Sequence, residues 1–165
     1  MRRTIIRILV TGLALALLAG CGGLPVGRAD RAILLDGAVN NYRKLIRWGY
    51  YDEAAKYLRE TDGRAITADL KNAAKFRVTN YTVSSQIMDD TGKEARVVAT
   101  IEYYELDAGV IHTLHDEQVW WYDAKEKRWY LNAALPRFGQ PDGANDAADD
   151  KRTAPAPAPA ETPAR

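Results

Sequence analysis

The spacing of hydrophobic residues changes near position 76 and divides the middle of the chain into two parts. Before this point apolar side chains recur every three or four residues, which is typical of helices with one buried face. We expect a helix at 30–48, ended by Gly49 as a C-terminal cap, and two short helices at 53–59 and 67–74. The buried face of the first helix should carry Leu35, Ala38, Val39, Tyr42, Leu45 and Ile46.

After position 76 the hydrophobic period is two, which indicates strands. Four strands are expected, at 76–88, 95–103, 110–122 and 129–133. Polar turns separate them, and Gly109 suits the left-handed position of a three-residue hairpin loop. Helices followed by hairpin-connected strands indicate an α+β domain in which N-terminal helices pack on a four-stranded antiparallel sheet.

The beginning of the chain has the pattern of a bacterial signal peptide. An apolar run at 8–18 is shorter than the roughly 20 residues that a membrane-spanning helix needs. It is preceded by three basic residues, Arg2, Arg3 and Arg7. A secretory signal is therefore favoured over a membrane span.

The four residues that end this region resemble the bacterial lipobox: Leu18, Ala19, Gly20 and Cys21. The resemblance implies cleavage after residue 20 and acylation of the Cys21 sulfur, and two or three acyl chains hold a protein to a membrane almost permanently. In Gram-negative lipoproteins a residue other than aspartate after the cysteine, here Gly22, implies the outer membrane, with the protein facing the periplasm. An uncleaved signal anchor and a coincidental cysteine are the alternatives.

These patterns divide the chain into four regions: a signal peptide at 1–20, an acylated cysteine and flexible tether at 21–29, a globular domain at 30–138, and a tail at 139–165. The tail is rich in alanine and proline and lacks large apolar residues beyond its start. It cannot bury enough apolar surface to fold, so we expect it to be disordered.

Composition excludes several classes of function. Removing the signal peptide with its three arginines leaves 20 basic and 22 acidic residues, a net charge of −2, which favours neither nucleic-acid binding nor a polybasic membrane patch. Cys21 is the only cysteine, so no disulfide is expected. His112 and His115 are three apart in a strand and should point to opposite faces, so they cannot share a metal. We expect no cofactor and no metal.

The best acid–base candidates lie in the third strand. His115 and Glu117 share one face, and a three-residue hairpin loop would place His115 opposite Ile101 and near Tyr103. A histidine that is simply hydrogen-bonded on a half-buried sheet is the favoured alternative. His112 and Asp116 on the other face are a weaker candidate pair.

Aromatic residues are concentrated in the last hairpin and should lie on both of its faces. One face must cover the helices, which leaves rings of the other face near solvent, where they indicate a protein contact or a dimer. Stabilisation of the sheet by cross-strand ring pairs is the alternative. The predicted interaction surface consists of Trp120, Trp121, Trp129 and Tyr130.

The order of one long helix, two short helices and four strands ending in Trp120-Trp121-Tyr122 and Arg128-Trp129-Tyr130-Leu131 resembles the nuclear transport factor 2-like superfamily. The resemblance implies a curved, cone-like sheet. Some members, such as polyketide cyclases, use the enclosed pocket for acid–base chemistry, but their Asp/His pair has no clear counterpart here, so no catalytic residue carries over. The segment 46–52, with Pro136, is also similar to uncharacterised proteobacterial lipoproteins.

Together these patterns predict a non-enzymatic, lipid-anchored envelope protein that acts as a binding or interaction module on the periplasmic side of a membrane. The alternative is an isomerase-like or cyclase-like enzyme with a pocket lined by Tyr42, Tyr103, His115 and Glu117. Fold resemblance alone does not decide between them, because function depends on the site.

Overall fold

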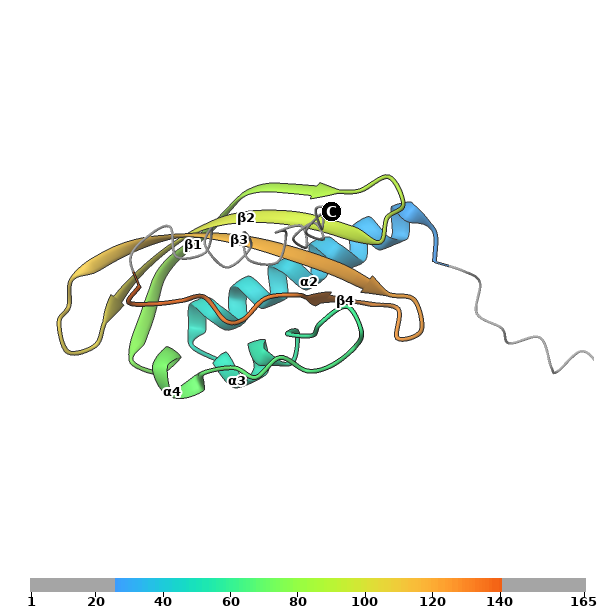
Figure 1. Ribbon diagram of the computed structural model, residues 1–165. Coiled ribbons are helices and arrows are strands. Elements are labelled where there is room, and N and C mark those ends of the chain that lie inside the picture. The colour runs from blue at the N-terminus through green and yellow to red at the C-terminus, as the bar shows by residue number, and fades with distance from the viewer. Residues whose placement is uncertain (1–25, 141–165) are drawn as a thin grey trace, which may run out of the picture.

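The computed structural model describes residues 26–140, which form a layer of helices against one antiparallel sheet (Figure 1). The predicted signal peptide, the lipobox with Cys21 and the chain from residue 141 onward lie outside the described residues. In the part of the chain that the structure describes, three helices precede four strands, so the predicted α+β class is confirmed. Within residues 26–140, no helix combines the length and the hydropathy needed to cross a membrane.

The long helix α2 (Arg28–Trp48) begins two residues before its predicted start. Its most buried side chains follow the predicted spacing: Leu35, Val39, Tyr42 and Ile46. Gly49 ends the helix with φ at 74°, and the amides of Gly49 and Tyr50 donate to the carbonyls of Ile46 and Leu45. This left-handed cap turns the chain directly into the next helix.

The helices α3 (Tyr51–Ala55) and α4 (Leu70–Ala73) are shorter than predicted. The chain leaves α3 after Ala55, and Leu58 forms a parallel bridge with Leu131 of the last strand. The Arg59 amide donates to the Leu131 carbonyl at 3.0 Å, and the Leu131 amide donates to the Tyr57 carbonyl at 2.8 Å. The predicted helix at 53–59 is wrong over its second half, because pairing with the sheet edge satisfies these backbone groups instead.

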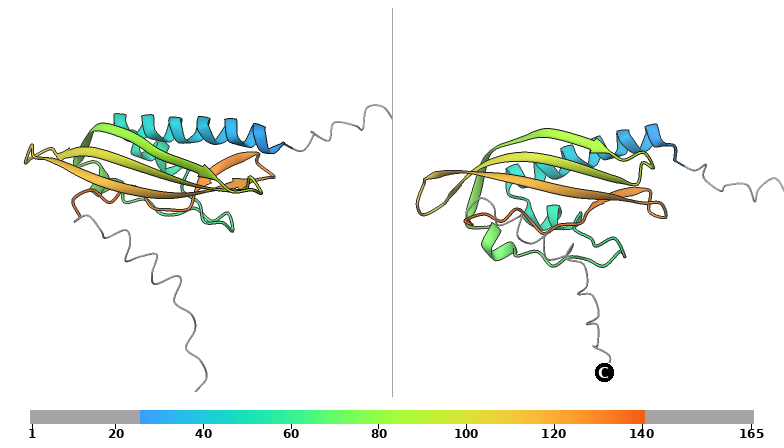
Figure 2. Two further views of the ribbon diagram at one scale, coloured as in Figure 1. Left: turned by 90° about the horizontal axis from the view of Figure 1, so that it is seen from above. Right: turned by 45° about the horizontal axis from the view of Figure 1, so that its top comes forward.

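The sheet has the strand order β1 (Phe76–Met88), β2 (Glu94–Glu105), β3 (Ile111–Asp123) and β4 (Arg128–Leu131), with each strand antiparallel to the next. It is curved, and α2 lies along one of its faces (Figure 2). Two bulges in β1 contribute to the bend, one at Thr79 and one at Ser84. The hydroxyls of both residues donate to carbonyls of β2 at 3.1 Å.

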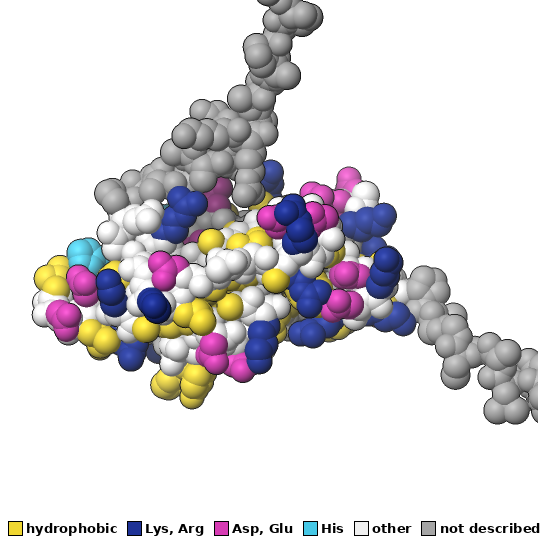
Figure 3. Space-filling view, turned by 60° about the horizontal axis from the view of Figure 1, so that its bottom comes forward, with side chains coloured by type: hydrophobic (Ala, Val, Ile, Leu, Met, Phe, Trp, Pro, Cys, Tyr) yellow, Lys and Arg dark blue, Asp and Glu magenta, His cyan; other side chains and the backbone are white. Residues whose placement is uncertain are grey.

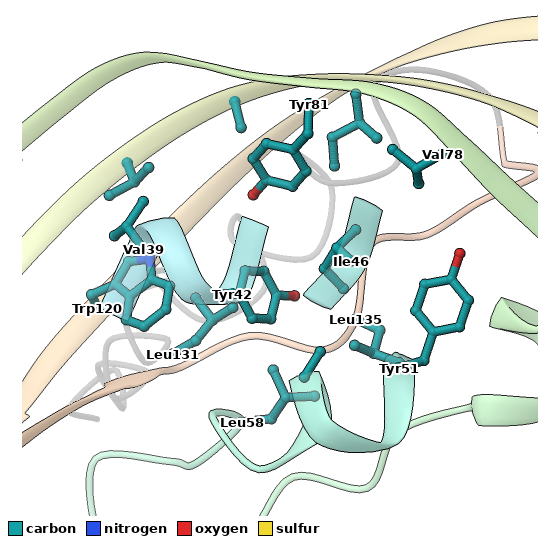
Figure 4. Packing of buried hydrophobic residues seen from close by; sticks show 14 of the residues in the cluster. Val39, Tyr42, Ile46, Tyr51, Leu58, Val78, Tyr81, Trp120, Leu131 and Leu135 are labelled. Atoms are coloured by element: carbon teal, nitrogen blue, oxygen red, sulfur yellow. The ribbon is translucent and has the colours of Figure 1, made fainter. Parts of the chain in front are cut away.

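The core fills the space between α2 and the sheet (Figure 4). Trp120 of β3 is fully buried, and its ring lies edge-on to the rings of Tyr42 and Tyr57, with centroids 5.7 and 5.9 Å apart. The side of β2 that faces the helix is buried from one end to the other. Its buried residues are Ala95, Val97, Ala99, Ile101 and Tyr103. Aromatic rings from both layers therefore pack together with aliphatic side chains in the interior.

After β4 the chain crosses the end of the domain opposite the start of α2, and Phe138 enters the core there. Its ring centroid lies 4.9 Å from that of Tyr103 and 5.6 Å from that of Phe76. The Gly139 amide donates to the Tyr103 hydroxyl at 3.0 Å. The fold therefore extends past the last strand, as far as the described chain reaches.

Gly139→Ala should lower the free energy of unfolding by about 1–3 kcal/mol. Gly139 has φ at 78°, and a Cβ there would lie 2.9 Å from Cζ of Phe76, a ring held by the rings of Tyr103 and Phe138. Gly37→Ala is the matched control, because a Cβ at Gly37 meets nothing within 4 Å. Alanine inside a helix should raise stability by roughly 0.5–1 kcal/mol. Urea unfolding measures both effects, and equal changes in the two variants would contradict this account.

Candidate functional site

His115 and Glu117 lie on the outer face of the sheet, away from α2. His115 pairs with Thr100 and Glu117 with Val98, and both side chains are exposed. His115 Nδ1 lies 3.4 Å from the Thr100 hydroxyl. The predicted placement of His115 opposite Ile101 is wrong, and so is the predicted pocket that combined these two residues with Tyr42 and Tyr103.

The error comes from one residue of hairpin register. A three-residue loop at 107–109 would pair Leu106 with Val110, whereas the structure pairs Tyr104 with Ile111. The amides of Ala108 and Gly109 both donate to the Glu105 carbonyl, so the turn closes one residue earlier than predicted. A one-residue slip moves every side chain of β3 to the other face of the sheet relative to β2.

The weaker predicted pair, His112 and Asp116, lies on the side of β3 that faces the helix. His112 pairs with Tyr103, and the two rings lie 5.5 Å apart. His112 is exposed at the end of the sheet, whereas Asp116 is half-buried near its middle. No contact joins the two residues, and in the described range no group of three or more His, Cys, Asp or Glu side chains is arranged to hold a metal ion.

The predicted aromatic surface is largely interior. Trp120, Trp129 and Tyr130 are at most 2% exposed, and Trp121 is half-buried. The Arg59 guanidinium lies 4.2 Å above the Tyr130 ring, and the Trp121 indole donates to the Arg59 carbonyl at 2.9 Å. The expectation that Trp129 and Tyr130 reach solvent is wrong. Trp129 lies on the inner face, where its indole donates to the Arg31 carbonyl of α2 at 2.9 Å. Tyr130 lies on the outer face, where the segment that pairs with Leu131 covers it.

The structure instead gathers polar side chains on the inner face, around Gln118. This residue is 2% exposed, and its amide nitrogen lies 2.6 Å from both the Tyr81 hydroxyl and Asp116 Oδ2. Its amide oxygen accepts from the Trp120 indole at 2.9 Å. Gln118 therefore links residues of two strands and fixes the position of the Asp116 carboxyl group. We call Tyr42, Tyr81, Asp116 and Gln118 the inner polar cluster.

Tyr42 completes this cluster from α2. Its side chain is fully buried, and its hydroxyl has no hydrogen-bond partner among the described residues. The Tyr42 and Tyr81 rings both project into the space between α2 and the sheet (Figure 4). Burial, followed by the negative charge of Asp116, raises the pKa of the Tyr42 hydroxyl. Tyr122, beneath the Arg31 guanidinium, carries the other unpartnered hydroxyl in this range.

Asp116 is the residue of the cluster that titrates near neutral pH. Burial raises its pKa to about 6, and the hydrogen bond from Gln118 offsets part of this shift. Burial and the Asp116 charge also raise the pKa of Tyr81, which the half-buried Arg43 of α2 partly opposes. A carboxyl group whose pKa is close to neutral pH, near a phenol hydroxyl that lacks a hydrogen-bond partner, can bind a small polar group or exchange a proton with it.

Sequence reasoning found Asp116 only as a weak candidate, assigned Tyr42 to a pocket with other residues, and missed Tyr81 and Gln118 as members of a site. The alternation of β3 does place residues 116, 118 and 120 on one face. A polar residue at 118 beside a core tryptophan was the available signal for a buried hydrogen-bond network. Tyr42 of α2 and Tyr81 of β1 join the cluster only through tertiary packing, which the alternation within β3 does not predict.

The described surface also has exposed apolar residues at the hairpin between β2 and β3. Leu106, Val110 and Ile111 are between 48% and 66% exposed. Figure 3 shows hydrophobic side chains at that end of the molecule, and basic and acidic side chains interspersed over the rest of the same face. This face therefore carries no broad field of one sign.

No protein-family model and no curated protein matches this chain. Among solved structures, the crystal structure of a "putative polyketide cyclase" from Xanthomonas campestris pv. campestris is similar to it, with 12% sequence identity. The similar region covers 66% of this chain and 93% of the other, with a TM-score of 0.41. We base no conclusion about function on this similarity.

Proposed function

We propose that this protein is a lipid-anchored cell-envelope protein whose α+β domain binds a small ligand on the periplasmic side of a membrane. Acyl chains on Cys21 hold it there, in the inner leaflet of the outer membrane. The lipobox Leu18-Ala19-Gly20-Cys21 supports the anchor. The observation that supports binding is the buried hydroxyl of Tyr42, which lies in an aromatic interior near Asp116 and has no partner among the described residues.

The physical reason is the cost of leaving a polar group unpaired. A buried donor without a partner costs about 1–3 kcal/mol, and a ligand that supplies an acceptor recovers that energy. Ligand sites in proteins are mostly apolar, with a few convergent polar groups that orient the ligand. The inner polar cluster matches this description, because Gln118 fixes Asp116 while aromatic rings surround Tyr42. The ligand class is a small molecule with an apolar body and a carbonyl or hydroxyl group.

An enzymatic role is the second candidate, and the pKa of about 6 at Asp116 favours it. A carboxyl group with a pKa near the working pH can remove and return a proton efficiently. In this role Asp116 takes the place that sequence analysis gave to His115 and Glu117. The two candidates differ in one outcome. An enzyme releases a chemically changed ligand, and Asp116→Asn should then bind the ligand without converting it.

The anchor is tested with Cys21→Ser in the full-length chain. The wild-type protein should appear in the membrane fraction and enter detergent, and mass spectrometry should find an acylated N-terminal Cys21. The variant should lose the acyl mass and should not be processed as a lipoprotein. A mature wild-type protein that begins elsewhere, or that carries a free Cys21 thiol, would exclude the anchor.

The binding role is tested with Tyr42→Phe, which removes only the hydroxyl. Because this hydroxyl has no partner among the described residues, the change should not destabilise the domain. Native mass spectrometry of protein purified from envelopes should show a small molecule bound to the wild type and a loss of most of it from the variant. Identical spectra from the two proteins, with no bound molecule, would make the cluster purely structural.

A further inference from the structure

The helix α2 presents large apolar side chains on the face that points away from the sheet. Ile33 is 69% exposed, Leu34 41% and Trp48 71%. Within residues 26–140, no other helix or strand lies on the far side of α2 (Figure 2). We define the outer face of α2 by the exposed positions opposite its buried stripe: Asp30, Ile33, Leu34, Gly37, Asn40, Asn41, Lys44 and Trp48.

The charges at the C-terminal end of the helix favour contact with a partner surface that is anionic. Lys44 lies on the outer face and Arg47 beside it, and both are exposed. Of the acids near the N-terminal end, Asp30 accepts from the Gly27 amide, and Asp36 accepts from the Gln86 side chain of β1. The acids are thus engaged within the domain, whereas no ion pair of Lys44 or Arg47 occurs in the described residues.

The covalent distance to Cys21 restricts where this face can lie. Gly27, which immediately precedes α2, is the sixth residue after Cys21, and even a fully extended chain over those six steps spans only roughly 20 Å. The 21 residues of α2 make it about 30 Å long. Ile33 and Leu34 lie within two turns of its start. If Cys21 is acylated, this end of the helix stays close to the lipid headgroups at a high effective concentration.

We infer that the outer face of α2 rests on the bilayer that holds the anchor, with the helix axis along the membrane surface and the sheet turned away from it. This inference rests on the proposed lipid anchor. Ile33 and Leu34 enter the interface beside the anchor, and Trp48 lies at headgroup depth at the far end, where tryptophan is enriched in membrane proteins. Lys44 and Arg47 contact anionic headgroups.

Tryptophan fluorescence tests this orientation, because Trp48 is the exposed member of the four tryptophans. Trp120 and Trp129 are at most 2% exposed, and Trp121 is half-buried. The acylated full-length protein is reconstituted into vesicles of phosphatidylethanolamine and phosphatidylglycerol, with or without brominated acyl chains. Brominated lipid should quench a component of the emission, and transfer from detergent should shift that component to shorter wavelength. Trp48→Phe should remove both effects without changing flotation.

The double variant Ile33→Asp and Leu34→Asp tests the contact at the other end of the helix. Both side chains are exposed, so the domain should keep its thermal stability. The variant should still float with vesicles through its acyl chains, but its Trp48 emission should escape brominated lipid and become accessible to iodide. Unchanged quenching in this variant would overturn the inference.

The remaining outcomes distinguish a failure of the proposed orientation from a failure of the proposed anchor. A wild-type protein that floats while its Trp48 remains unquenched and open to iodide overturns the orientation and leaves the anchor intact. Protection of Trp48 from iodide without quenching by brominated lipid also overturns it, and indicates a protein partner or a second copy on this face. Failure to float overturns the anchor and the orientation together.

A tryptophan introduced as Val110→Trp in the Trp48→Phe background tests the opposite end of the molecule. It should not be quenched by brominated lipid. Quenching there would mean that the hairpin end touches the membrane, which contradicts the proposed orientation.

Discussion

Trp120→Ala should lower the free energy of unfolding by about 3–5 kcal/mol, the range for truncating a large buried aromatic side chain. Trp120 is fully buried, its ring packs against the rings of Tyr42 and Tyr57, and its indole donates to Gln118. Its removal leaves a cavity and an unsatisfied amide oxygen on Gln118. Urea unfolding followed by far-ultraviolet circular dichroism measures the change without relying on tryptophan emission.

Trp48→Ala is the matched control for this prediction, because it makes the same chemical change on the surface. Trp48 is 71% exposed, and its loss should alter stability by no more than about 0.5 kcal/mol. Trp120→Phe separates packing from hydrogen bonding, since it keeps a ring and removes the indole donor, at a cost of about 1–3 kcal/mol. A Trp120→Ala variant as stable as Trp48→Ala would mean that this ring does not lie in the core.

The elements with strong local signals could be predicted from the sequence. The buried stripe of α2 and its left-handed end at Gly49 follow from a period of 3.6 and the conformational freedom of glycine. The alternation of β2 identified its buried face from Ala95 to Tyr103. These features depend on residues close together in the chain, where the preferences of the backbone and of burial agree.

The features that the sequence did not reveal depend on choices between nearly equivalent local structures. The hairpin at Gly109 can close in either of two registers, and that choice decides whether His115 or Asp116 faces the helix. The pairing of Leu58 with Leu131 joins segments 73 residues apart, so no local pattern indicates that Tyr130 is covered. The predicted enzyme pocket and aromatic surface both failed at these two points.

The difference in free energy of unfolding between Asp116→Asn and the wild type should be about 2–3 kcal/mol more favourable to the variant at neutral pH than in acid. The pKa of Asp116 is about 6 in the folded protein, against 3.8 for an unperturbed aspartate side chain. Each unit of difference corresponds to about 1.4 kcal/mol. Asparagine keeps an oxygen that can accept from Gln118 and removes the charge that burial disfavours. The measurement is urea unfolding of the wild type and the variant at pH 3.5 and pH 7.5.

The direction of this pH dependence follows from the number of protons that Asp116 binds in the folded and the unfolded states. Between about pH 3.8 and pH 6 the folded protein keeps a proton on Asp116 that the unfolded chain has released, so wild-type stability falls through this window as the pH rises. Below the window Asp116 is protonated in both states and contributes nothing. Above pH 6 the loss is complete and constant. The variant lacks this term, so its advantage should grow through the window and then level off.

Comparison at two pH values removes the effects that do not depend on protonation. Any fixed cost of fitting the new amide group beside Gln118 and Tyr81 appears at both pH values and cancels, as do the titrations of all other carboxyl groups, Asp89 included. Asp107→Asn, the same change in an exposed loop, should alter stability by no more than about 0.5 kcal/mol at either pH. A difference between wild type and Asp116→Asn that stays constant from pH 3.5 to pH 7.5 would show that Asp116 is well solvated. The case for a ligand or proton-transfer site at the inner polar cluster would then lose its electrostatic support.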